Sequence, residues 1–407
     1  MIYVGIDVAK DKHDCSIINS DGKPLFKVFQ IQNTREGFDK LFSRISSAEP
    51  DASNVKVGLE ATGHYHLNLL GYLLDKSLPT CVLNPLQVSA FKKGVSLRKT
   101  KTDTVDARVI AKMLMSDMAL RPYSDLLYQL DELKSISRYR FRKIQEQTKL
   151  KVSISRLVSI LFPELEQCVS SLHLASVYAL LSELPSAKDI ASCNILRLTS
   201  ILGKASHMRF KKAKAEEIKA AAKASIGRAS PSLTLELKQT IKMAGVLNAE
   251  IKEINAEIEK IMRDIDSPIL SIPGIGFING AMILAEIGDF SRFSSPDKIL
   301  AFAGISPSSH QSGKSISGHA RMEKRGSRYL RFALINATRL ACQHEPFRSY
   351  LLKKQAEGKH YNVAIPHAAK KLVRIIFALT RTNQPYKWSR DDLPSSAPAA
   401  DICRFNP

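Results

Sequence analysis

The chain has 407 residues, which is too long for one ordinary domain and suits two or three. Hydrophobic residues make up 44% and charged residues 24%, a composition that excludes bulk disorder. Lysine and arginine number 60 against 39 aspartates and glutamates, so the net charge is +21. This surplus favours a polyanionic partner, and nucleic acid is the commonest one, although ribosome-associated and membrane-surface proteins are basic too.

The cysteines and the N-terminus point to a reducing compartment. Six cysteines are scattered without a CxxC pair, so we expect reduced, mostly buried thiols in a cytosolic protein. The first residues lack the basic flank and apolar core of a signal peptide. An apolar run at 269–288 is interrupted by Pro273 and by glycines, so we expect no membrane span.

The first region, 1–130, predicts a sheet with helices around it. Strands are expected at 2–8, 15–18 and 25–31, with a hairpin turn at 21–22. Helices are expected from Thr34, over 65–74 and from Thr102, and short strands at 55–59 and 80–83. Three strands in a meander, followed by alternating helices and strands, give a mixed α/β architecture. That order suits a ribonuclease-H-like fold.

The rest of the chain predicts helices. Over 131–265 we expect two long helices with an inserted helical segment at about 163–235, and one of them carries Ile251, Ile254, Ile258 and Ile261 at helical spacing. Flanking lysines and glutamates make this stripe look like one strand of a coiled coil, so it should pair with another helix of the same chain or of a second protomer. Region 266–380 predicts a smaller helical domain, and the tail 381–407, rich in Pro, Ser and Ala, should be poorly ordered.

Four carboxylates stand where they could hold a metal. Asp7 ends an apolar strand, Glu60 ends a second one, and Asp103 and Asp106 lie on one face of a helix start. Taken singly, each fits an ordinary role as a strand-end acid or as a helix N-terminal acid favoured by the dipole. Together, hard oxygen ligands from two strand ends and one helix are what a Mg²⁺ pair needs to activate a nucleophile and stabilise a leaving oxygen.

A second set of candidates lies in the last third of the chain. The segment 304–315 is dense in hydroxyls, and residues 301–360 hold 11 lysines and arginines against three acids. This pattern fits a flexible loop beside a solvated basic helix, or a serine nucleophile in a positive field that holds a phosphate. Residues expected to contact nucleic acid are Lys99, Lys101, Lys314, Arg321, Lys324, Arg325, Arg328 and Arg331.

The sequence Ile272-Pro-Gly-Ile-Gly276 resembles a helix-hairpin-helix turn. In such a turn the amides of Gly274 and Gly276 could contact a DNA phosphate at a helix N-terminus. The same five residues also fit a plain interhelical turn.

These motifs occur in one order: Asp7, Glu60, Asp103-x-x-Asp106, Pro-Gly-Ile-Gly and Gly-x-x-Pro-x-x-x-x-Ser-Gly. That order resembles the DEDD insertion-sequence transposases, relatives of the Piv-type DNA invertases. Two blocks carry the resemblance, about 1–160 and 265–350, and the second includes Ser312-Gly313 and Lys324-Arg-Gly326.

The resemblance implies a RuvC-like domain whose four carboxylates bind Mg²⁺, joined by a coiled coil to a smaller helical domain with a catalytic serine. Ser312 stands at the position of the serine that attacks a DNA phosphate and forms a covalent intermediate. The family also implies a homodimer or homotetramer whose protomers share active sites, and a bridging noncoding RNA that pairs with donor and target DNA. Such a protein is expected at the nucleoid, in the cytoplasm of a bacterium or archaeon.

Two other functions remain open on the sequence. The first is a RuvC-like nuclease that hydrolyses branched DNA with the same carboxylates and no serine. The second is a non-enzymatic, basic nucleic-acid-binding protein with a degenerate carboxylate site. An adduct between protein and DNA that depends on Ser312 would exclude the nuclease. Stabilisation of the chain by Mg²⁺ that Asp103→Asn abolishes would argue against the binding protein.

Overall fold

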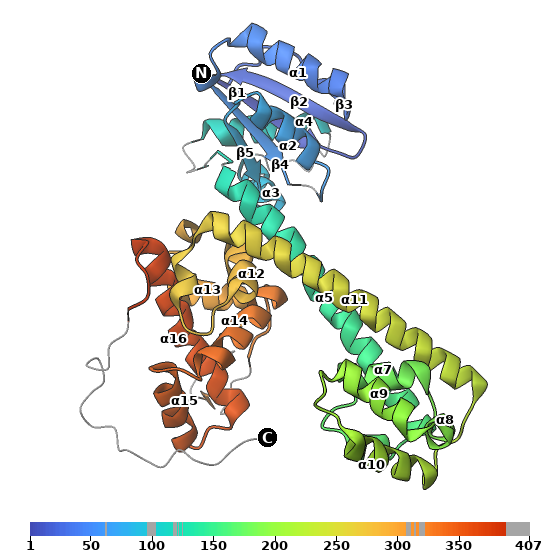
Figure 1. Ribbon diagram of the computed structural model, residues 1–407. Coiled ribbons are helices and arrows are strands. Elements are labelled where there is room, and N and C mark those ends of the chain that lie inside the picture. The colour runs from blue at the N-terminus through green and yellow to red at the C-terminus, as the bar shows by residue number, and fades with distance from the viewer. Residues whose placement is uncertain are drawn as a thin grey trace. The chain divides into compact units, whose positions relative to one another are not determined.

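The computed structural model describes residues 1–61, 63–95, 103–116, 120, 122–123, 125–306, 311–312, 315–316 and 322–387 (Figure 1). For 95, 103–105, 125–128, 311–312 and 315–316 it describes the backbone alone. The chain forms two compact units, Met1–Tyr128 and Gln129–Pro407. The finer division at about 265 and 380 stays a prediction.

The first unit is built on a five-stranded sheet with the order β3-β2-β1-β4-β5. Strand β2 runs antiparallel to both β1 and β3, whereas β4 is parallel to β1 and β5 is parallel to β4. An antiparallel meander followed by two parallel strands on the far side of β1 is the arrangement of the ribonuclease-H-like fold, so the predicted fold class is confirmed. The strands are β1 (Ile2–Val8), β2 (Lys12–Asn19), β3 (Phe29–Gln32), β4 (Val55–Glu60) and β5 (Thr80–Leu83).

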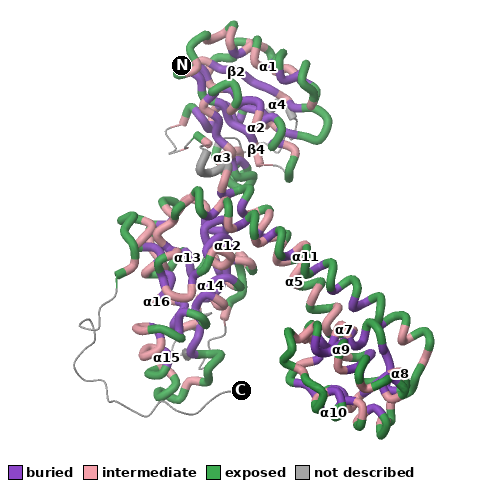
Figure 2. The backbone as a smooth tube through the Cα atoms, viewed as in Figure 1, coloured by how far each residue is buried: buried purple, intermediate pink, exposed green. Residues whose placement is uncertain are grey.

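Helices cover both faces of this sheet, and the alternation of side chains along each strand decides which residues meet which helix. Val4, Ile6 and Val57 face one way and pack in a buried cluster with residues of α1 (Arg35–Ala48) and α2 (Leu67–Asp75). On the opposite face, α4 (Asp103–Met115) lies against the strands, with α3 (Pro85–Val95) beside it. The buried strands between the two helical layers are visible in Figure 2.

The structure differs from the sequence prediction at two elements of this unit. Strand β3 begins at Phe29 rather than at Leu25, because the chain at Pro24 makes only an isolated bridge to Ile18 and Leu25 is 42% exposed. Helix α3 was not predicted at all. Its start carries a recognisable signal, because Asn84 accepts a hydrogen bond from the Leu86 amide and Pro85 occupies the first helical position.

Two long helices, α5 (Asp125–Leu161) and α11 (Pro231–Ile265), run side by side in the second unit. They are antiparallel, because Arg140 binds Asn255 near one end and Arg156 binds Glu236 near the other. Ile251, Ile254 and Ile258 are buried on α11, so the pairing expected of this stripe is found within the chain. The coiled-coil packing itself stays a prediction.

Five short helices form a small helical insertion between α5 and α11. Their apolar residues join those of the neighbouring ends of both long helices, from Ile154 to Leu161 and from Leu237 to Ala244, in one buried cluster. Most residues of the cluster belong to the insertion itself, and the ends of the two long helices complete its core. The helices are α6 (Leu165–Cys168), α7 (Ala175–Glu183), α8 (Ala187–Ser192), α9 (Ile195–Ala205) and α10 (Lys212–Lys223).

The remaining helices follow α11. Helices α12 and α14 pack together, and α16 packs against α13, α14 and α15. Across the described ranges, no helix is long and apolar enough to cross a membrane. The elements are η2 (Pro268–Ser271), α12 (Phe277–Ile287), η3 (Phe290–Arg292), α13 (Pro296–Ala303), β6 (Gln311–Ser312), β7 (Ser315–Ile316), α14 (Arg328–Ala341), α15 (Phe347–Ala356) and α16 (Tyr361–Thr382).

Candidate functional site

Asp7 and Glu60 lie at the ends of neighbouring parallel strands. Ile6 pairs with Leu59 in the β1–β4 register, so each acid is one residue beyond an aligned pair. Asp7 points to the same face as Gly5, and Glu60 to the same face as Gly58, because side chains two residues apart share a face. That face is the one covered by α4, because a Cβ built at either glycine would meet α4 atoms.

Helix α4 crosses this face in the direction opposite to β1. Gly5 lies so close to it that an added Cβ would be 2.2 Å from the Ala107 carbonyl oxygen and 2.3 Å from the Ala111 nitrogen. The last residue of α4, Met115, lies beside Gly22. Gly22 is in the turn after Asn19, which pairs with Ile2 at the start of β1. The first turn of α4 therefore lies toward the ends of β1 and β4, where the two acids are.

Asp106 lies in this first turn of α4 and already has a cationic partner. The Lys92 ammonium of α3 donates to Asp106 Oδ1, and the two side chains are 26% and 19% exposed. Sequence reasoning missed Lys92, because no motif marks a lysine that reaches its partner only through the packing of α3 on α4. The fourth predicted acid, Asp103, begins α4, and its side chain lies outside the described residues.

The donor chemistry of Asp7, Glu60 and Asp106 fits a hard divalent cation, because carboxylate oxygens are the ligands that Mg²⁺ and Mn²⁺ prefer. Among the described side chains, no group of three or more His, Cys, Asp or Glu residues is close enough to hold a metal ion. Asp7 and Glu60 each have an interaction partner. The metal site thus stays a prediction. Asp7 and Glu60 lie on the face of the sheet that α4 covers, and the first turn of α4, with Asp106, lies toward them.

The predicted nucleophile lies in a two-stranded ribbon of the second unit. Ser312 ends β6 and pairs with Ser315 of the antiparallel strand β7. Only the backbone of both serines is described, and the predicted nucleic-acid contacts Lys99, Lys101, Lys314 and Arg321 lie outside the described residues.

The described basic residues after the ribbon have different surroundings. Lys324, Arg325 and Arg328 are exposed. Arg328 lies over the Tyr329 ring, 4.9 Å from its centroid. Arg331 instead donates to the Ala303 and Lys324 carbonyl oxygens, at 2.9 and 3.2 Å, and so ties the segment to the end of α13.

The two glycines of the hairpin before α12 also differ. Gly274 has φ +87°, and an added Cβ would be 2.3 Å from the Ala341 nitrogen of α14. Its conformation is thus required for packing. Gly276 caps the N-terminus of α12 with no side-chain cap bond and no neighbour near its Cβ position, so it alone resembles the open helix end predicted for a phosphate contact.

An ion pair with a buried carboxylate joins α5 to α12 and α14, and sequence reasoning missed it. Glu286 is 3% exposed and receives bonds from Arg138 (2.5 and 3.0 Å) and from the Ser327 hydroxyl (2.6 Å). Burial alone would raise the pKa of Glu286, but the bonds from Arg138 and Ser327 outweigh it and lower the pKa. Ser327 also accepts the Leu330 amide, so the same carboxylate positions the start of α14. The available signal was a single acid in the apolar helix Phe277–Ile287.

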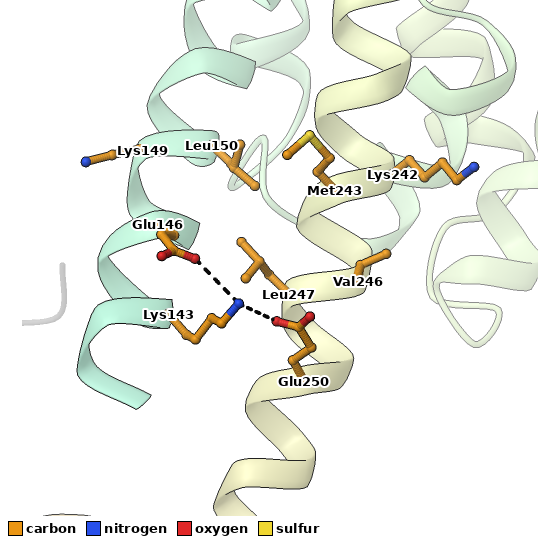
Figure 3. Close-up of a pocket in the computed structure, with 9 residues that line it drawn as sticks. All are labelled: Lys143, Glu146, Lys149, Leu150, Lys242, Met243, Val246, Leu247 and Glu250. Carbon is orange, nitrogen blue, oxygen red and sulfur yellow. Dashed lines mark ion pairs between the residues drawn. The ribbon is translucent and has the colours of Figure 1, made fainter. Parts of the chain in front are cut away.

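A pocket of about 520 Å³ lies between α5 and α11 (Figure 3). Its floor is apolar, with Leu150, Met243, Val246 and Leu247. Lys143 on the rim pairs with Glu250 at 2.9 Å. Met243 and Val246 are 58% and 54% exposed, which is unusual for apolar residues on a helix already packed on one side.

Comparison with known proteins assigns the chain to a class. Residues 4–163 match the DEDD family model described as "Transposase", and residues 266–352 match the model described as "Transposase IS116/IS110/IS902 family". The insertion element IS116 uncharacterized 44.8 kDa protein of Streptomyces clavuligerus is 24% identical over 93% of this chain and 94% of its own length. The pilin gene-inverting protein of Moraxella lacunata is 23% identical over 94% of this chain and 97% of its own length.

Among solved structures, Thermus thermophilus RuvC in complex with a Holliday junction substrate is similar, with a TM-score of 0.22 and 13% identity. The match covers 30% of this chain and all of RuvC. The two family models assign the protein to the transposase class of enzymes. It belongs to the DEDD insertion-sequence transposases of the IS116/IS110/IS902 family, as the order of its motifs predicted.

Proposed function

We propose that this transposase is a site-specific recombinase that cuts and rejoins DNA with Mg²⁺ at Asp7, Glu60, Asp103 and Asp106 and with Ser312 as the nucleophile. The main support for the metal site is that Asp7 and Glu60 lie on neighbouring parallel strands and point to the same face of the sheet, which α4 covers. The first turn of α4, with Asp106, lies toward the same edge.

In this proposal the carboxylates and the serine divide the work. A bound Mg²⁺ supplies Lewis-acid stabilisation of charge on the phosphate oxygens. Asp7, Glu60, Asp103 and Asp106 would hold that cation through their carboxylate oxygens. Ser312 attacks phosphorus, its proton leaves to a base or to water, and the departing 3′ or 5′ oxygen takes up a proton, so that a phosphoserine ester preserves the energy of the broken bond for rejoining. Exposed Arg325 and Arg328 neutralise backbone phosphates.

We propose that the protein binds a donor DNA and a target DNA, and that a bridging noncoding RNA selects both sequences by base pairing. The net charge of +21 supports a polyanionic partner. A protein that leaves base pairing to an RNA needs phosphate contacts more than a base-reading helix, as in other guided systems. We expect the protein to act at the nucleoid, in the cytoplasm.

The test uses the full chain, Mg²⁺ and a nicked suicide DNA substrate, with the adjacent noncoding RNA transcript added. After denaturing electrophoresis, wild type should yield a covalent protein–DNA adduct. Ser312→Ala should bind DNA with unchanged affinity and form none, whereas Ser315→Ala, on the paired strand, is the matched control and should keep it. DNA cleavage by Ser312→Ala without an adduct would instead support a hydrolytic nuclease, and DNA binding with no cleavage by wild type would support a binding protein.

We also propose a homodimer or homotetramer that associates through the α5–α11 pair. The support is the exposed apolar floor of the pocket in Figure 3, where Met243 and Val246 would be buried by a second copy. Analytical ultracentrifugation should show that Met243→Lys weakens self-association, while Lys238→Glu, another exposed change on α11, does not. A wild-type protein that is monomeric at high concentration would refute the proposal.

A further inference from the structure

The ion pair between Lys92 and Asp106 bears on the metal site. We propose that Lys92 is an internal counter-cation that competes with the divalent metal ion for Asp106, and thereby sets the metal affinity of the carboxylate site. This inference rests on the proposed metal site and concerns how that site is regulated.

The packing of α3 fixes where Lys92 can reach. Val88, one turn earlier on α3, is 4% exposed and belongs to the buried cluster with Ile110 and Met113 of α4. Residues four apart lie on the same side of a helix, so Lys92 also faces α4. Its ammonium then meets the Asp106 carboxylate, and with side chains only 26% and 19% exposed the pair is partly shielded from water.

Lysine and a metal ion cannot both hold Asp106 at full strength. The Oδ1 oxygen that accepts the ammonium proton has less electron density to offer a cation. A divalent ion beside an ammonium group also experiences like-charge repulsion. Lys92 therefore weakens metal binding by Asp106, and its long, flexible stem permits it to move away when a metal ion binds.

Without metal, the ion pair has a function of its own. Asp7, Glu60 and the first turn of α4 bring acids to one edge of the sheet, and neighbouring acids repel each other. Lys92 offsets part of that charge and holds α3 on α4. Metal binding should release this contact, so the loaded and empty states differ at α3.

The test is calorimetric titration of the metal-free full chain with MnCl₂. Lys92→Met should bind Mn²⁺ about five-fold more tightly than wild type, the effect of removing one competing, partly exposed ion pair. Lys92→Gln is a second neutral variant with the same expectation, and Lys92→Arg should stay within about two-fold of wild type because it keeps the cation. The matched control is Lys93→Met, which makes the same change in net charge at the exposed neighbouring residue.

Hydrogen exchange of α3 gives an independent readout. Mn²⁺ should speed exchange over Pro85–Val95 in wild type and have little further effect in Lys92→Gln. Equal or weaker Mn²⁺ binding by both neutral variants, compared with Lys93→Met, would overturn the role of Lys92 and leave the metal site standing. If wild type bound no Mn²⁺, or if Asp106→Asn bound it as well as wild type, both the metal site and this inference would be wrong.

Discussion

Replacing Arg138 with methionine should destabilise the second unit by leaving a buried carboxylate without its cation. Glu286 is 3% exposed, and in the variant its described donors are reduced to the Ser327 hydroxyl. Breaking a buried ion pair from one side costs about 3–5 kcal/mol. Because Arg138 is itself 38% exposed and water could reach its place, we expect a loss at the lower limit, about 3 kcal/mol.

The penalty should depend on pH in a defined direction. In wild type the lowered pKa of Glu286 means that its stabilising contribution is present above the ordinary glutamate pKa and is lost as the pH falls through the lowered value. In Arg138→Met burial dominates and raises that pKa, so the carboxyl can take up a proton and escape the cost of a buried charge. The difference between variant and wild type should therefore be larger at pH 8 than at pH 5.

Hydrogen exchange of α12 and α14 measures this locally, which suits a chain with two units. Arg142→Met is the matched control, because Arg142 is an exposed arginine of the same helix that lies over Tyr139. The double variant Arg138→Met/Glu286→Leu should regain most of the lost protection, since an apolar pair removes the stranded charge. The reasoning is refuted if Arg138→Met changes the α12 protection free energy by less than about 0.5 kcal/mol at pH 8, or if its effect is as large at pH 5.

Three further results are expected. Gly5→Ala should destabilise the first unit by about 3 kcal/mol in urea unfolding, because its Cβ would meet α4 backbone, whereas Gly71→Ala, with open space, should be neutral or stabilising by up to about 1 kcal/mol. Gly274→Ala should lower the thermal stability of the second unit through positive φ and the Ala341 backbone, while Gly276→Ala should leave it nearly unchanged and provide the cleaner test of a DNA contact by binding assay. Burial raises the thiol pKa of Cys15, and raises that of Cys81 to about 11, so in the native protein neither should react with a thiol reagent at pH 8 until the first unit unfolds.

The sequence was informative wherever one local rule decided the outcome. The apolar residues of Ile2–Val8 located β1, and those of 55–59 before Glu60 located β4, so the fold class could be predicted. The isoleucine stripe of α11 likewise predicted a partner helix, and α5 is that partner. The predicted start of the third strand at Leu25 was wrong, because a pattern of apolar residues contains no information on where pairing begins, and β3 begins at Phe29.

The candidate site could be predicted only in part, for a physical reason. Asp7 and Glu60 stand out because acids at the ends of buried strands are rare, and a motif ties them to Asp106. Lys92 and Arg138 are ordinary residues of polar helices until tertiary packing brings them to Asp106 and Glu286. The partners in these two pairs are separated by 14 and by 148 positions in the sequence. Such contacts follow from tertiary packing, which local sequence patterns do not encode.

The helical insertion has a consequence for how the chain folds. Its two ends meet, because the Arg228 amide donates to the Ile160 carbonyl oxygen at 3.0 Å. Joining α5 to α11 through residues 162–230 as an unstructured segment would cost roughly 2.5 kcal/mol more in chain entropy than a four-residue turn, at about 0.6 kcal/mol for each doubling of length. Once folded, the insertion acts as that short turn. The core of the insertion also contains Ile154 and Leu237 of the two long helices. Pairing of α5 with α11 can therefore begin beside the insertion and extend along the helices toward Arg140 and Asn255. We expect the closure of this compact element to come first in the folding of the unit, and the remaining turns of α5 and α11 to pair after it.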